Sequence, residues 1–260
     1  MTDSAGSVVY SASYDADGDM TLRNGFPLTW TVDNLPASLA SATGSSTFRY
    51  GPGGNRYQQV ATEGGNSTTT TYIDGLLEVR YDSGSSETVY RNYIEAGVET
   101  MAANGSGTLT ADTLGFFVHD EVGSVIATVT ENLGGANQAM SLTSYGAWGK
   151  ARPTLTAGGE TAYASLGPGN YLTGTPVGQQ EGYAGHEDLE GIGLVEMEGR
   201  VYDPEVGRFL SPDPNVQYPE SSQGYDRYSY VNDNPMSLSD PSGYFSTDAA
   251  SARTAARPST

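Results

Sequence analysis

The sequence has no cysteine, little positive charge and no long apolar run. Without cysteine in its 260 residues it cannot form a disulfide, a thiolate zinc site or a cysteine nucleophile. Twelve lysines and arginines stand against 31 aspartates and glutamates, which gives a net charge of −19. A surface of that sign repels phosphate backbones and anionic lipids, so nucleic-acid binding is disfavoured.

The amino-terminal residues lack the features of an export or membrane segment. Residues 1–19, MTDSAGSVVYSASYDADGD, have neither the basic start nor the continuous apolar stretch of a cleavable signal peptide. No apolar run in the sequence approaches the length that spans a bilayer. We expect a chain that is secreted or held at the cell surface by another route, with a cytoplasmic stage before export, or a part of a longer protein.

Glycine and aromatic residues are abundant. Glycine fills 34 of the 260 positions, nearly twice the average share of roughly 7%. The sequence also has 18 tyrosines and 6 phenylalanines, whereas disordered chains have few aromatics. This composition predicts an ordered, turn-rich, all-β protein.

Several segments alternate or concentrate β-branched and aromatic residues, as strands do. Asp74-Gly75 divides one of them and predicts a hairpin turn. A helix is predicted only over residues 136–142, and the tail from Thr247 suits a short helix or disorder. The strand-like segments are 47–60, 68–82, 86–94 and 124–135.

The turns between these segments share a pattern. An aromatic residue is followed by Asp or Gly, then by small turn-forming residues, then by a strand, at intervals of roughly 20–30 residues. The aromatic ring buries a large apolar face, and Asp-Gly supplies the reversal for the next strand. The five examples are YDADGDMTLRNG (14–25), RYGPGGNRY (49–57), YIDGLLEVRYDSG (72–84), FVHDEVGSV (117–125) and SYGAWGK (144–150).

These aromatic-Asp turns resemble the YD repeats of the RHS family, and residues 182–245 resemble the RHS repeat-associated core of bacterial polymorphic toxins. The residues that carry the second resemblance are GYAGHE, GRVYDPEVGRFLSPDP, DRYSYVNDNP and DPSGYF. The resemblance implies a YD-repeat shell of antiparallel hairpins over residues 1–181, closed by a core plug over 182–245. It also implies that residues 246–260 stand where an effector, here missing or truncated, would begin.

The same resemblance implies self-cleavage after the DPSGY motif, at the Tyr244–Phe245 bond, by an aspartyl-type reaction. Asp213 and Asp226 are the candidate pair, because two close carboxylates share one proton and can act as acid and base. They meet if the segments SPDP and YDRYSYV pair. The alternative for each is a turn residue that caps backbone N–H groups.

Other residues near this motif have simpler interpretations. Arg208 and Arg227 either support a carboxylate or form structural ion pairs, and the second is preferred. Asp240, Pro241 and Gly243 are turn residues that present the Tyr244–Phe245 bond or simply end the core. No metal or cofactor motif is complete: the Asp-rich segment 15–19 departs from a calcium loop at Met20 and Phe26.

Three functions fit the sequence. The first is a structural and processing module of a toxin shell, which encloses a C-terminal effector and cleaves itself at most once, with a secretion apparatus as a possible partner. The second is a secreted or surface structural or adhesion protein, which associates through β edges or binds carbohydrate. An independent turnover enzyme comes third, because no site for an external substrate is evident.

Overall fold

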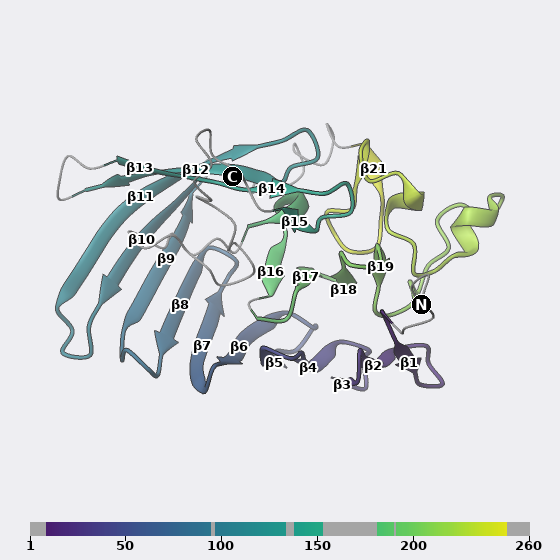
Figure 1. Cartoon of the computed structure of the whole chain (residues 1–260), viewed down its shortest axis with the longest axis horizontal. Helices are drawn as coiled ribbons and strands as arrows, with labels where there is room; N and C mark the ends of the chain where they lie inside the picture. The colour runs from purple at the N-terminus through teal and green to yellow at the C-terminus, as the bar shows by residue number, and fades with distance from the viewer. Residues whose placement is uncertain (1–8, 95–96, 134–137, 153–180, 190, 249–260) are drawn as a thin grey trace.

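The computed structural model describes residues 9–94, 97–133, 138–152, 181–189 and 191–248, and these residues confirm the all-β prediction. Thirteen strands form one antiparallel sheet in which each strand pairs with the next along the chain (Figure 1). They are β1 (Ala12–Tyr14), β2 (Met20–Arg23), β3 (Phe26–Trp30), β4 (Pro36–Ala40), β5 (Gly44–Tyr50), β6 (Arg56–Glu63), β7 (Asn66–Ile73), β8 (Leu77–Asp82), β9 (Thr88–Ile94), β10 (Gly97–Ala103), β11 (Leu109–His119), β12 (Val125–Asn132) and β13 (Gln138–Leu142).

The predicted hairpins are confirmed, and the predicted helix is wrong. Asp74 and Gly75 form the turn between β7 and β8, both at positive φ. The segment predicted as a helix contains β13, which pairs with β12 from Gln138 to Leu142. The ladder to a neighbouring strand outweighs a weak helical pattern in so short a segment.

A single turn geometry recurs in the large sheet and beyond it. The first residue donates its N–H to the carbonyl four positions on, and the fourth residue, at positive φ, donates back to the first carbonyl. This is the three-residue hairpin loop that ends in a left-handed residue beside a bulge, and the pairing register shifts next to five of these turns. The turns are residues 15–19, 31–35, 51–55, 104–108, 120–124 and 146–150.

A second, four-stranded sheet lies on the concave side of the large one (Figure 1). We call residues 181–248 the C-terminal core. Two short pairs of strands and three short 3-10 helices complete the described elements, and none of the helices in this part of the chain is long and apolar enough to cross a bilayer. These elements are β16 (Glu187–Leu189), β17 (Leu194–Met197), β18 (Arg200–Asp203) and β19 (Arg208–Phe209); the pairs β14 (Ser144–Tyr145) with β15 (Ala151–Arg152) and β20 (Leu238–Ser239) with β21 (Thr247–Asp248); and the 3-10 helices Tyr183–Gly185, Ser222–Tyr225 and Val231–Asp233.

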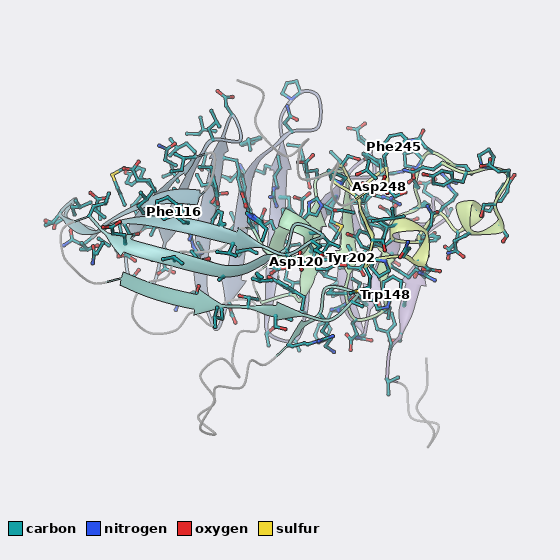
Figure 2. The ribbon with its side chains drawn as sticks, turned by 90° about the horizontal axis from the view of Figure 1, so that it is seen from above. Phe116, Asp120, Trp148, Tyr202, Phe245 and Asp248 are labelled. Carbon is teal, nitrogen blue, oxygen red and sulfur yellow. The ribbon has the colours of Figure 1, made fainter. Side chains whose placement is uncertain are left out.

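The four-stranded sheet is buried on both faces. One face packs against strands β2–β5 through an apolar cluster of Met20, Leu28, Leu39, Phe48, Leu189, Ile192, Leu194, Val201 and Leu210. The other face carries a cluster of aromatic rings, in which Tyr202 and Tyr230 have centroids 4.7 Å apart. The Tyr202 hydroxyl donates to the Trp148 carbonyl at 3.0 Å, and Figure 2 shows these two residues together. Packing on both sides fixes the strand ends that carry the candidate site.

Candidate functional site

The Asp240 turn organises the end of the C-terminal core. The buried Asp240 carboxylate accepts hydrogen bonds through Oδ1 from the N–H groups of Ser242, Tyr244 and Phe245, at 3.2, 3.0 and 2.9 Å. Gly243 has φ of +72°, and a Cβ there would lie 2.1 Å from the Met197 carbonyl oxygen. The turn therefore requires glycine at this position both for its conformation and for its space.

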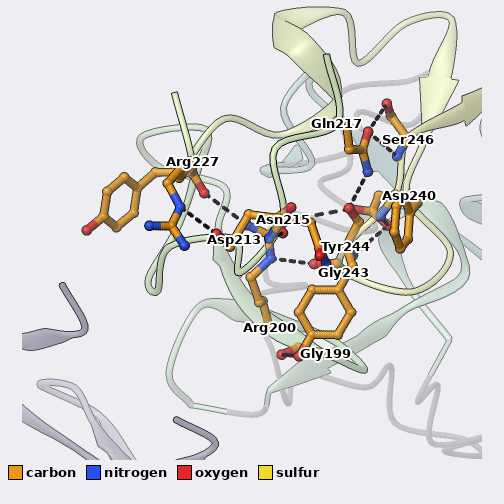
Figure 3. A network of polar contacts seen from close by, with 12 residues as sticks. Gly199, Arg200, Asp213, Asn215, Gln217, Arg227, Asp240, Gly243, Tyr244 and Ser246 are labelled. Carbon is orange, nitrogen blue, oxygen red and sulfur yellow. Dashed lines mark hydrogen bonds and ion pairs between the residues drawn. The ribbon is translucent and has the colours of Figure 1, made fainter. Parts of the chain in front are cut away.

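The Tyr244–Phe245 peptide bond is held on both sides. The Tyr244 carbonyl oxygen accepts a hydrogen bond from Nε2 of Gln217, and the Phe245 N–H donates to Asp240 as described above (Figure 3). The Tyr244 hydroxyl donates to the Gly199 carbonyl at 3.0 Å. A Cβ on Gly199 would lie 2.1 Å from the Tyr244 ring, so glycine makes the slot in which this ring lies.

Arg200 lies at the centre of the site. Its buried guanidinium contacts Oδ2 of Asp213 at 3.1 Å and Oδ2 of Asp240 at 3.8 Å through Nη2. Its Nε donates to the Gly243 carbonyl, one residue before the candidate bond (Figure 3). The guanidinium lies 3.6 Å from the centroid of the Phe209 ring, which covers it from the core side. One arginine therefore joins two of the three Asp-Pro motifs of the core, those of Asp213 and Asp240.

Asp213 lies beside the YDRYSYV segment, the arrangement that the hypothesis of an Asp213–Asp226 pair requires. Its N–H donates to the Arg227 carbonyl at 2.8 Å, so the SPDP and YDRYSYV segments run side by side. Its Oδ1 accepts from the Asn215 N–H at 2.7 Å. Burial raises the pKa of the Asp213 carboxyl, against the opposing effects of the Asn215 N–H and the Arg200 guanidinium. Asp213 therefore holds a proton more readily than an exposed aspartate.

Asp226, the other predicted carboxylate, lines the same pocket as Asp213. It forms its ion pair with a different arginine. Its Oδ2 is 3.5 Å from Nη2 of Arg208, and both side chains are half-exposed. Its Oδ1 also accepts from the Tyr228 N–H at 3.2 Å, as a turn residue would. Arg208 reaches Asp233 as well, at 2.5 Å. The structure therefore brings Asp213 and Asp226 to one pocket and gives each its own arginine.

Arg227 serves the backbone of the site. Its Nε donates to the Asp213 carbonyl, at 2.5 Å, and its own carbonyl accepts from Nη1 of Arg200 at 3.0 Å.

Nε2 of the buried His186 lies 2.8 Å from the Asp240 carbonyl oxygen. Burial lowers the pKa of His186, which suits a neutral ring that donates from Nε2.

Three residues of the site were missed by the sequence analysis: Gly199, Arg200 and Gln217. Gly199 and Arg200 stand directly before the VYDP motif, but nothing local marks their contacts with residues more than 40 positions on. Gln217 lies in the loop between the two candidate acids, Asp213 and Asp226. Of residues 214–220, Gln217 is the one that turns partly inward, and only the folded chain reveals this.

No protein-family model matches the chain. The chain is similar to the tRNA3(Ser)-specific nuclease WapA of Bacillus spizizenii, with 29% identity, and to the tRNA nuclease WapA of Bacillus subtilis, with 28% identity. Each alignment covers 90% of this chain and 9% of the relative. A 61-residue segment is 39% identical to salivary gland surface protein 1 of Aedes aegypti and covers 24% of this chain and 2% of that protein.

A solved structure has the same fold. A chain in the crystal structure of TcdB2-TccC3-Cdc42 superposes with a TM-score of 0.64 at 22% sequence identity. The match covers 89% of this chain and 11% of that one. The chain thus shares its fold with a segment of a far longer protein, and its sequence resembles a comparable small part of the WapA nucleases.

Proposed function

We propose that this chain is the C-terminal part of an RHS-type toxin shell, whose core presents the Tyr244–Phe245 bond for a single self-cleavage. One observation carries the proposal. Gln217 donates a hydrogen bond to the carbonyl of this bond and Asp240 accepts one from its N–H, while the buried Arg200 lies next to Asp240. These contacts hold one peptide bond in a fixed geometry on the pocket that Asp213 and Asp226 also line, which supports a single cleavage there.

The shell part of the proposal is supported by the large sheet. Its strands follow one another in chain order and bend around the C-terminal core (Figure 1). Strand β1 pairs with β2 on one side and is an edge of the sheet among the described residues, so preceding strands of a longer protein can add there. The similarity to about a tenth of much longer proteins fits a shell end of this kind.

The cleavage is a hydrolysis that uses one water molecule. The water oxygen bonds to the Tyr244 carbonyl carbon, and the bond from that carbon to the Phe245 nitrogen breaks. We assign Asp226, ion-paired with Arg208, to accept the proton from water. Asp213 donates its proton to the departing nitrogen, and the new carboxyl group of Tyr244 returns its proton to Asp213 and becomes a carboxylate. The raised pKa of Asp213 suits the donor role.

Mass spectrometry of the intact chain tests the proposal. The expected result is loss of the peptide that begins at Phe245, and the full mass for the Asp213→Asn variant. Asp33→Asn, on an exposed turn away from the core, is the matched control and should cleave like the parent chain. A folded parent chain that keeps its full mass from pH 5 to pH 8 would contradict the proposed cleavage.

A further inference from the structure

Gln217 contacts the candidate bond and the chain that leaves it. Its Nε2 donates to the Tyr244 carbonyl oxygen, while its Oε1 accepts from the Ser246 N–H at 3.2 Å and from the Ser246 hydroxyl at 3.0 Å (Figure 3). A single side-chain amide thus spans the unit from Tyr244 to Ser246. The residues on either side of Gln217 are exposed, so the loop turns this one side chain inward.

We propose that Gln217 is a catalytic residue, the donor that stabilises the negative charge which develops on the Tyr244 oxygen. This inference rests on the self-cleavage proposed above. When water adds to the carbonyl carbon, the electron pair of the C=O bond moves onto oxygen, and an N–H group already aimed at that oxygen stabilises it. The charge disappears again when the C–N bond to Phe245 breaks.

The neighbouring donors are engaged elsewhere. Nε of Arg200 binds the Gly243 carbonyl, one peptide unit earlier, and Nη2 faces Asp213 and Asp240. Asp240 accepts from N–H groups and has no donor of its own when ionised. Gln217 is therefore the side chain whose donor the structure places on the Tyr244 oxygen.

Because Gln217 also binds Ser246, substitutions can test its donor on the Tyr244 oxygen separately from its part in folding. Gln217→Glu keeps the length of the side chain and an oxygen for Ser246, but it puts an acceptor where the donor was. Gln217→Met keeps the approximate length and removes both polar contacts. Gln58→Met is the matched control, because Gln58 is a partly buried glutamine on β6 that does not line the pocket of Asp213 and Asp226.

The experiment follows cleavage of the full chain over time after cell-free synthesis, by intact mass. Both Gln217 variants should cleave roughly 10²–10³-fold more slowly, the usual effect of removing one such donor. Their urea unfolding midpoints, and the cleavage rate of Gln58→Met, should stay close to the parent values. If Gln217→Met fails to fold, Gln217→Glu alone makes the test.

The outcomes distinguish the two proposals. A parent chain that does not cleave overturns both. A parent chain that cleaves, an Asp213→Asn variant that does not, and folded Gln217 variants that cleave at the parent rate overturn the role of Gln217 and leave the self-cleavage standing.

Discussion

Two regions of the same sheet hold the C-terminal core in different ways. Strands β2–β5, which we call the apolar region, present Leu28, Leu39 and Phe48 to the core. Strands β6–β12, the polar region, continue the same face with polar side chains. The face can be followed from strand to strand because directly opposed residues of neighbouring strands share it. One row across this region is Tyr72, Glu78, Arg91, Thr100 and Thr113, of which the last four are buried.

The polar region contacts the core through charge. Arg56 on β6 forms an ion pair with Glu187 on β16 and lies 3.5 Å from Glu196 on β17. The Tyr72 ring covers its guanidinium at 4.5 Å, and the Tyr72 hydroxyl donates to Glu187 at 3.1 Å. One sheet thus uses apolar area at one end and buried charge at the other to position the same core.

The largest expected effect comes from breaking the charged contact. Arg56→Met leaves Glu187 and Glu196 buried without their cation, and removing one partner of a buried ion pair costs about 3–5 kcal/mol. Urea denaturation should show a loss of that size. Arg49→Met on the neighbouring strand, where the side chain is exposed, should stay within about 0.5 kcal/mol. Equal losses for the two variants would refute the charged contact.

The next effect concerns the apolar contact. Leu39 is fully buried in the apolar cluster, so Leu39→Ala leaves a cavity between the sheet and the core and should cost about 3 kcal/mol. The control is Leu22→Ala on β2, where the side chain is 40% exposed and little apolar area is lost. The same denaturation series measures both. A loss for Leu22→Ala as large as that for Leu39→Ala would mean that the apolar region does not fix the core as described.

Much of the large sheet was predictable and much of the site was not, for a physical reason. Turn residues such as Asp74-Gly75 act through their own backbone conformation, so the sequence alone reveals them. The pairing of the Asp213 and Asp226 segments was a condition of the hypothesis, and the short loop between them permits it without requiring it. In contrast, the roles of Arg200 and Gln217 depend on contacts across the fold, which no local pattern encodes.

The difference between the apolar and polar regions was also hidden in the sequence. A run such as Thr68–Thr71 offers the same residue to both faces of β7, so alternation gives no sign of which side is buried. The register with Phe48 through Gln59 identifies the face. The wrong helix over residues 136–142 has the same origin, since its segment is defined by its pairing with β12.

A smaller effect is expected from pH. Burial raises the pKa of Glu78 and of Asp188 to about 7. The folded chain therefore holds protons that the unfolded chain, with ordinary carboxyl pKa values, has lost by pH 6. Their contribution to stability is present at low pH and disappears as the pH rises through about 7.

The free energy of unfolding should accordingly fall between pH 6 and pH 8, by about 1 kcal/mol for each group with a pKa near 7. Denaturation curves at the two values measure it. Glu78→Gln should make this fall in the free energy of unfolding smaller by the amount that one group contributes. Glu99→Gln, at a less buried carboxyl of β10, should leave the fall unchanged. Stability that rises from pH 6 to pH 8 would contradict the assignment.

The smallest effect tests what the two regions have in common. Gly25 between β2 and β3, and Gly75 between β7 and β8, each follow a residue at positive φ and have φ of +83° and +67°. No atom lies within 4 Å of a Cβ built on either glycine, so alanine there meets only backbone strain. Gly25→Ala and Gly75→Ala should therefore each cost about 1 kcal/mol, in spite of the different side chains around them. A clearly larger loss at one site would show that the regions differ in their turns as well as in their inner faces. Equal losses would confine the difference to the face that meets the core.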